Sequence, residues 1–171
     1  MTDRTGKPFL YVVVCAAGIA DGVGTLIAAA RDRGWEVGVI ATPAATNGFF
    51  DLAAAERLTG RTVRSAWRTP RDPRPFPPPD AVVVAPATFN TVNKWAAGIA
   101  DTLAVGTLCE ALGLGVPIVV LPRVGEALAA HPAYGESVAR LTALGVRFGE
   151  GGGDGGFPWE SALDLLEPPP R

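Results

Sequence analysis

The sequence predicts a doubly wound α/β fold, in which helices cover both faces of a parallel β-sheet and give three layers. Short apolar runs alternate with helix-like segments along the chain, a pattern typical of right-handed β-α-β units. These runs are continuous rather than alternating, as expected for strands that are buried on both faces. With 171 residues, of which 48% are hydrophobic, the chain can bury a core and fits a single domain over residues 1–171.

The first three elements are predicted from short apolar and Ala-rich segments. Residues 9–15 are apolar and rich in valine, and we expect them to form the first buried strand. Residues 19–33 are rich in Ala and Leu, and two arginines precede Gly34, which is typical of the end of a helix. Residues 36–41 form the second predicted strand.

A second helix is predicted over residues 49–58, and Gly60 terminates it. The next segment, residues 61–80, contains five arginines and six prolines, and this proline density excludes regular structure except for a short edge strand at 62–66. Such a segment is either a solvated surface loop or a lid or partner-binding arm.

The third strand is predicted over residues 81–85 because Val-Val-Val lies between alanines. An Ala-rich helix follows over residues 91–111, with a break near Thr102. Residues 117–121 contain another β-branched run and form the fourth predicted strand.

The last part of the chain is predicted to contain a helix over residues 134–144 and a short strand over 146–148. Residues 150–157 are rich in glycine and predict a hinge. The hinge opens a carboxyl-terminal tail over residues 150–171, with a final helical turn or two at 161–166.

Composition excludes several function classes. The net charge of −2 and the isoelectric point near 5.4 argue against a nucleic-acid or membrane-surface binder. Two cysteines, Cys15 and Cys109, and a single histidine, His131, provide neither a disulfide framework nor a metal site. The longest apolar run is too short to span a membrane, so we expect a cytoplasmic protein with reduced thiols.

Ligands of doubly wound sheets bind beyond the carboxyl ends of the strands. Four small or polar segments leave the predicted strands there: residues 15–18, 41–44, 85–91 and 121–124. The first could present backbone N–H groups to a phosphate. The third places Thr88 and Asn90 immediately before a helix, where either residue could be an ordinary N-cap.

Residues 86–91 read Pro-Ala-Thr-Phe-Asn-Thr, and residues 98–103 read Gly-Ile-Ala-Asp-Thr-Leu. These segments resemble the PxSxNT…GIxDNL motif of the flavin-containing cysteine decarboxylases, a family that includes phosphopantothenoylcysteine decarboxylase. Residues 42–45 and the His-Pro-Ala at 131–133 also resemble stretches of that family. The resemblance covers about residues 9–160, and the motif at 86–103 is its specific part.

The resemblance implies a flavodoxin-like fold that binds FMN without a covalent bond, in homo-oligomers built on trimers. It also implies a reaction in which the flavin oxidises a substrate cysteine to a thioaldehyde, so that CO₂ leaves. Thr42 corresponds to the residue that binds the FMN phosphate, and Asn90 has an additional catalytic role. The residues that the resemblance assigns to FMN are Ala16, Ala17, Gly18, Thr42, Ala87, Thr88, Asn90 and Thr91.

The chain departs from this family at residues that carry catalysis. Asp72 stands fourteen residues before Pro86, where the family has its catalytic histidine. In the segment that corresponds to the PxMNxxMW substrate motif, Gly125 replaces the asparagine and Ala129 the aromatic residue. The glycines at 151–156 replace a flap that carries a cysteine in the coenzyme A pathway enzyme. Asp72 remains a candidate for the catalytic base.

Arg123 is a second catalytic candidate, because a guanidinium at the end of a strand could bind an anionic substrate. The Pro122-Arg123 pair also resembles the PRE motif of flavin prenyltransferases. A structural salt bridge from Arg123 to Glu126 is the simpler interpretation.

Four other features have mainly structural interpretations. His131 precedes a proline and is expected to cap a helix or lie at the surface. Trp95 is expected in the core or a subunit interface, and Cys109 as a small buried hydrophobe. The Phe-Pro-Trp at residues 157–159 predicts either a flap over the substrate or an anchor for the tail.

Together these observations favour an FMN-binding flavoprotein, and we expect an enzyme, either a decarboxylase-like lyase or an oxidoreductase. Its substrate would be a small or peptidyl thiol carboxylate, or another small molecule. Two alternatives remain: a non-catalytic member of the fold that acts through partners, and an enzyme similar to the flavin prenyltransferases.

Overall fold

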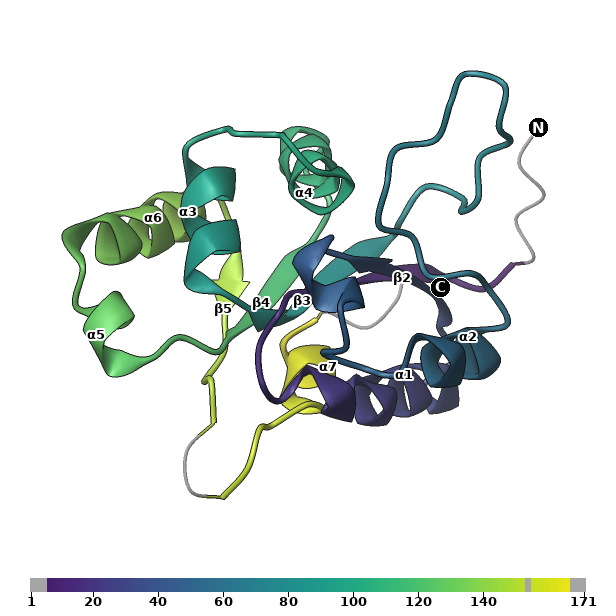
Figure 1. Cartoon of the computed structure of the whole chain (residues 1–171), viewed down its shortest axis with the longest axis horizontal. Coiled ribbons are helices and arrows are strands. Elements are labelled where there is room, and N and C mark those ends of the chain that lie inside the picture. Colours follow the sequence, from purple (N-terminus) through teal and green to yellow (C-terminus); the bar gives the residue numbers. More distant parts are fainter. Residues whose placement is uncertain (1–5, 153–154, 167–171) are drawn as a thin grey trace.

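The structure is a computed structural model that describes residues 6–152 and 155–166 (Figure 1). A five-stranded, all-parallel sheet forms its centre, in the order β2-β1-β3-β4-β5. The strands are β1 (Phe9–Val14), β2 (Glu36–Ala41), β3 (Ala81–Ala87), β4 (Ile118–Pro122) and β5 (Arg147–Phe148). The chain reverses its direction of travel across the sheet between β1 and β3, which makes this the topological switch point. The predicted parallel, doubly wound sheet is confirmed.

Helices cover both faces of the sheet and complete three layers (Figure 1). One face carries α1 (Val23–Asp32), α2 (Leu52–Thr59) and α7 (Ser161–Leu165), and the other carries α3 (Phe89–Ala96), α4 (Leu103–Gly113) and α6 (Pro132–Ala143). Shorter elements are the 3₁₀ turns η1 (Ala20–Gly22) and η2 (Ala44–Thr46) and the helix α5 (Glu126–Ala129). Alternate residues of β1 contribute to two separate hydrophobic clusters, one on each face.

Local sequence signals explain where the helices begin and end. The Asp51 carboxylate accepts a hydrogen bond from the N–H of Ala54 and starts α2, and Gly60, with a φ of +69°, ends it. Thr102 starts α4 in the same way, because its hydroxyl accepts from the N–H of Val105. The helix predicted over residues 91–111 is therefore two helices, with the break at the expected place.

Several predicted elements need correction. The edge strand expected at residues 62–66 is reduced to a single bridge between Arg64 and Ile40. The helix α5 was not predicted. Trp95 lies in the core, 2% exposed, as expected, whereas Cys109 is only half-buried.

The Pro/Arg-rich segment 61–80 is not simply a solvated loop. Phe76 is only 7% exposed, and its ring packs against the rings of Phe9 and Tyr11. The hydroxyl of Tyr11 donates a hydrogen bond of 2.8 Å to the carbonyl oxygen of Pro77, which fixes the same stretch. This loop therefore takes the place of a helix over the β2–β1 end of the face that α3, α4 and α6 cover.

Substituting Gly38 with alanine is expected to lower the free energy of unfolding by about 1–3 kcal/mol, the usual cost of overpacking a core. A Cβ at position 38 of β2 would lie 2.8 Å from the ring of Phe76. Gly135→Ala in α6 is the matched control: its Cβ meets no atom within 4 Å, so about 0.5–1 kcal/mol of stabilisation is expected. Urea unfolding of both variants tests this, and equal effects would contradict the packing of Phe76 on β2.

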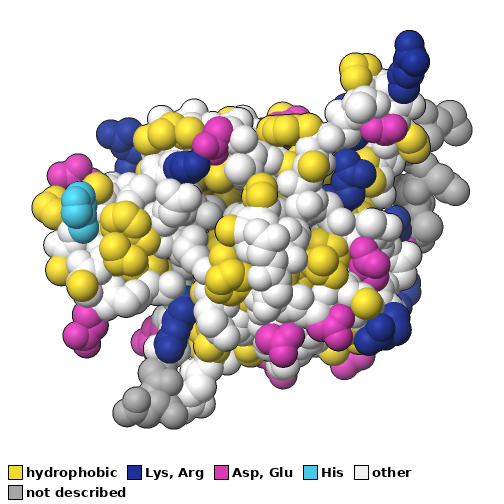
Figure 2. Space-filling model, viewed as in Figure 1, with side chains coloured by type: hydrophobic (Ala, Val, Ile, Leu, Met, Phe, Trp, Pro, Cys, Tyr) yellow, Lys and Arg dark blue, Asp and Glu magenta, His cyan; other side chains and the backbone are white. Residues whose placement is uncertain are grey.

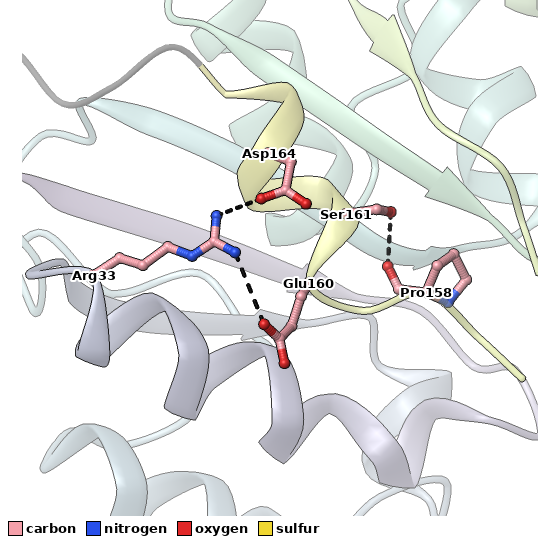
Figure 3. Close-up of polar contacts among 5 residues, drawn as sticks. All are labelled: Arg33, Pro158, Glu160, Ser161 and Asp164. Carbon is pink, nitrogen blue, oxygen red and sulfur yellow. Dashed lines mark hydrogen bonds and ion pairs between the residues drawn. The ribbon is translucent and has the colours of Figure 1, made fainter.

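The carboxyl-terminal segment is anchored on α1 (Figure 3). Arg33 pairs with Asp164 at 2.7 Å and with Glu160 at 3.8 Å, and the Ser161 hydroxyl donates to the carbonyl oxygen of Pro158. The indole of Trp159 is buried against Gly22, where it leaves no room for a Cβ. Of the two interpretations of residues 157–159, the structure supports the tail anchor.

None of the helices within residues 6–152 and 155–166 combines the length and the apolar character that crossing a bilayer requires.

Candidate functional site

Four strand ends meet at the carboxyl edge of the sheet, and hydrogen bonds join them side by side. The N–H of Cys15, after β1, donates to the carbonyl oxygen of Pro86 in β3 at 3.1 Å. The N–H of Thr42, after β2, donates to Val14, and the N–H of Arg123, after β4, donates to Ala87 at 2.8 Å. The structure thus brings together the segments that the sequence analysis assigned to this edge.

The amino terminus of α3 presents open hydrogen-bond donors at this edge. Thr88 occupies the N-cap position, but its side chain does not cap the helix. Across the described ranges, the N–H groups of Phe89, Asn90 and Thr91 donate no hydrogen bond. Unsatisfied donors at the start of a helix, together with the helix dipole, form a ready anion- or carbonyl-binding site.

A small network of side-chain hydrogen bonds connects the start of α3 to Cys15, the residue that follows β1. The hydroxyls of Thr88 and Thr91 lie 3.4 Å apart, and the Cys15 thiol lies 3.3 Å from the hydroxyl of Thr91. Burial raises the pKa of the Cys15 thiol, so this group stays protonated and acts as a hydrogen-bonding spacer rather than a nucleophile. No local sequence signal predicts this network, because it joins residues 76 positions apart.

The turn after β1 also provides free donors and free space. Ala17 is buried and its N–H bonds back to Cys15, whereas the N–H groups of Gly18 and Ile19 have no acceptor among the described residues. Ala16 is half-buried. A Cβ at Gly18 would meet no atom within 4 Å, so the space in front of this turn is open.

Thr42 lies one strand away from this turn. Its hydroxyl oxygen accepts from the N–H of Ala45 at 3.2 Å, which leaves the hydroxyl hydrogen available for a ligand. Asn90 is exposed, and its amide makes no hydrogen bond to the rest of the described chain. Ala87 is fully buried, and its carbonyl oxygen accepts from the N–H of Arg123.

Arg123 is exposed beside the start of α3. The predicted salt bridge to Glu126 is wrong: neither side chain forms an ion pair with any residue that the structure describes. Three residues, the first of them Arg123, separate the strand from the short helix α5, and the exposed guanidinium is free to face solvent or a ligand.

An aromatic group includes Phe89, which stands two residues after Ala87, the residue whose carbonyl oxygen accepts from the N–H of Arg123. Phe89 stacks on Tyr134, with ring centroids 6.1 Å apart, and meets His131 edge-on at 5.9 Å. The Nδ1 atom of His131 accepts from the N–H of Ala133, which confirms its predicted role as the cap of α6. In the sequence, the one sign of this aromatic group is that Phe89, a large aromatic residue, stands at a variable position of the motif.

Asp72 is not among the four strand ends. It lies fully exposed in the 61–80 loop, where its carboxylate accepts from the N–H and the hydroxyl of Thr69 at 2.8 and 2.9 Å. These hydrogen bonds hold the pKa of Asp72 below its ordinary value, which makes the carboxylate a weaker base. Elsewhere in the described residues, no three His, Cys, Asp or Glu side chains gather as a metal site would require.

Comparison with known proteins identifies one family and one curated relative. A family model described as Flavoprotein matches residues 3–156. A segment of 69 residues is 39% identical to the coenzyme A biosynthesis bifunctional protein CoaBC of Thermococcus kodakarensis. That segment covers 40% of this chain and only 17% of the length of the relative.

Solved structures share the fold over most of the chain. The FMN-dependent cysteine decarboxylase SpaF is 26% identical, with a TM-score of 0.72 over 84% of this chain and 83% of its own. The cysteine decarboxylase TvaF from thioviridamide biosynthesis reaches a TM-score of 0.77 over 92% of this chain and 94% of its own, at 22% identity. AnUbiX in complex with FMN and dimethylallyl pyrophosphate reaches 0.68 over 83% and 77%, at 15% identity.

Proposed function

Because the chain belongs to the Flavoprotein family, we propose that it binds FMN at the carboxyl edge of its sheet and acts there on a small or peptidyl thiol carboxylate. One observation carries the proposal. Two sets of unpaired N–H donors, at the turn after β1 and at the start of α3, open onto this edge on either side of the switch point.

The residues of the edge fit the two parts of FMN. The N–H groups of Gly18 and Ile19 and the hydroxyl of Thr42 are neutral donors suited to a phosphate. The donors at the start of α3 and the amide of Asn90 suit the polar rim of a flavin ring. Ala16, Ala17 and Ala87 are small, so they allow the backbone to approach the cofactor closely. FMN, when bound, supplies two-electron redox chemistry.

Arg123 and the Phe89 group would serve the substrate. The free guanidinium of Arg123 is suited to hold a carboxylate, and the rings of Phe89 and Tyr134 provide an apolar surface at the start of the neighbouring helix α3. Asn90 directly follows Phe89 in the first turn of α3, and its exposed amide can orient the substrate. The thiol carboxylate class is supported by the likeness to SpaF, an FMN-dependent cysteine decarboxylase.

The absorption spectrum of the purified, desalted protein tests the proposal. The expected result is that the protein retains FMN, which is identified after release by denaturation. Adding FMN to the apoprotein should restore the flavin absorption bands. Peptides that end in cysteine are then the first substrates to assay for CO₂ release. A colourless protein that takes up no added FMN would overturn the proposal and favour the non-catalytic, partner-binding alternative.

A second candidate function is prenyl transfer to the flavin, which is favoured by Arg123 after Pro122 and by the likeness to AnUbiX. Incubation with FMN and dimethylallyl phosphate distinguishes the two. The decarboxylase proposal predicts recovery of unmodified FMN, whereas a prenylated flavin would establish the second candidate.

We further propose that the protein is a homo-oligomer built on trimers. The exposed side chains of Ile99, Leu128 and Leu144 offer apolar surface for such contacts. Light scattering on the purified protein should give the mass of three chains or a multiple of it, and a monomer would contradict the proposal.

Replacing Thr42 with valine is expected to weaken FMN binding by about 10-fold or more. The substitution removes a hydroxyl donor to a charged phosphate, a bond that is worth about 1.5–3 kcal/mol, while the side-chain volume is kept. Thr46→Val is the matched control, because this hydroxyl bonds only to the Pro43 carbonyl at the surface. Quenching of flavin fluorescence gives the dissociation constant of FMN for each variant. Equal dissociation constants for the Thr42 and Thr46 variants would show that Thr42 does not bind the phosphate.

A further inference from the structure

A cavity of about 600 Å³ lies between the 61–80 loop and α4, over the β2–β1 end of the sheet. Tyr11, Ile40 and Phe76 form its floor, and one side of α4, including Leu103 and Thr107, forms a wall. The loop forms the opposite wall and stands beside α4 at the upper right of Figure 1. None of the residues that line the cavity belongs to the four strand ends.

Two aromatic rings give this cavity flat apolar walls. The Phe76 ring covers Gly38, and the Trp67 ring lies directly on Gly106 of α4, in both cases where a Cβ would not fit. Trp67 is 58% exposed, so most of its ring remains available for a ligand. Flat aromatic surfaces of this kind favour a stacked ring or another planar group.

The rim of the cavity carries more positive than negative charge. Arg64, Arg68 and Arg74 line it, with Glu110 as the one carboxylate among the lining residues. The guanidinium groups of Arg64 and Arg68 donate only to carbonyl oxygens of their own loop, and the Arg74 side chain forms no hydrogen bond or ion pair within residues 6–152 and 155–166. Figure 2 shows basic and hydrophobic side chains close together where this loop stands out from the molecule.

Tyr11 adds a neutral phenol to the floor. Burial and the charge of Glu110 raise its pKa to about 12, although Arg74 acts in the opposite direction. The phenol therefore stays protonated at neutral pH and bonds to Pro77, and it does not neutralise the nearby guanidinium groups. The positive charge of the rim remains available to a ligand.

We propose that this cavity binds a second small molecule, an organic anion in which a carboxylate or phosphate is attached to a flat aromatic group. The ring would lie between Trp67 and the floor, and the anionic group would pair with Arg74. The volume is in the range of small-molecule sites, about 300–1,000 Å³, and a guanidinium binds both kinds of anion in bidentate fashion.

Calorimetric titration of the full chain with naphthyl phosphate, naphthoate and the neutral naphthol tests this. At least one of the two anions should bind more tightly than naphthol. The difference in affinity between naphthyl phosphate and naphthoate tells which anionic group the site prefers. Saturation with FMN should leave the affinities unchanged. Absence of binding would overturn the proposal, and so would competition by FMN, which would place the probe at the carboxyl edge.

Two variants locate the probe. Arg74→Gln should weaken binding of the preferred anion by about 10–100-fold and leave naphthol unaffected, the loss expected for a charge-assisted hydrogen bond. Arg71→Gln is the matched control, since Arg71 is an exposed arginine of the same loop that does not line the cavity. Trp67→Ala should weaken all three probes. Equal affinities in the Arg74 and Arg71 variants would show that the anion binds elsewhere.

Discussion

Replacing Gly18 with aspartate is expected to weaken FMN binding by at least about 100-fold and to leave the apoprotein folded. Gly18 lies in the turn after β1, next to the free donors proposed for the phosphate. Its φ is not positive, and a Cβ meets no atom within 4 Å, so the backbone tolerates a side chain. A carboxylate there would repel a phosphate: two like charges about 4 Å apart interact by about 4 kcal/mol at an effective dielectric constant of about 20.

Gly18→Ala is the control for this substitution, because it adds the Cβ without the charge. It should keep FMN affinity within a few-fold of the parent, while melting curves of the apoproteins should coincide. Flavin fluorescence titration gives the affinities. If the aspartate variant binds FMN normally, the phosphate lies elsewhere; if both variants fail equally, the shape of the turn matters rather than its charge.

Trp159→Ala is expected to lower the free energy of unfolding by about 3–5 kcal/mol, the usual cost of truncating a large buried aromatic side chain. Trp159 is 9% exposed, meets Phe157 edge-on with ring centroids 4.6 Å apart, and belongs to the cluster that α1 and α7 share. Trp67→Ala is the matched control, since that indole is mostly exposed and its loss should cost less than about 1 kcal/mol.

The contact between Trp159 and Gly22 makes this prediction sharper. Gly22→Ala alone should be destabilising, because its Cβ would lie 2.7 Å from the indole nitrogen. In the Trp159→Ala background the same change should be tolerated, because the clash is gone. Urea unfolding of the four proteins measures the coupling. Additive effects would show that the tail does not pack on this turn.

The strands could be predicted to within two residues at each end, because β-branched runs bounded by Gly, Pro or small residues admit few other structures. The break near Thr102 was predictable for a similar reason, since a threonine that precedes an apolar run is a common N-cap. The role of the 61–80 loop could not be predicted from the sequence. Proline density correctly excluded helix and strand, but the burial of Phe76 depends on Gly38, a residue of a different element.

The site shows the same division between local and long-range information. The motif at 86–91 could be placed at the carboxyl edge of the sheet beside the other strand ends, since motif position and strand order suffice for that. The free state of Arg123 could not be predicted, because spacing places Glu126 within reach, whereas the backbone bond from Arg123 to Ala87 holds the strand end beside β3. The Cys15–Thr91 contact likewise requires knowledge that β1 and β3 are neighbours.

The docking of Trp159 on Gly22 also has a consequence for biosynthesis. The ribosome releases the turn after β1 early, whereas Trp159, which packs against Gly22, is synthesised only after all five strands. A nascent chain that ends before residue 157 has its first β-α-β unit but lacks the support under η1. The turn proposed to hold the FMN phosphate therefore reaches its final packing only after all five strands have been synthesised, and not together with the first β-α-β unit.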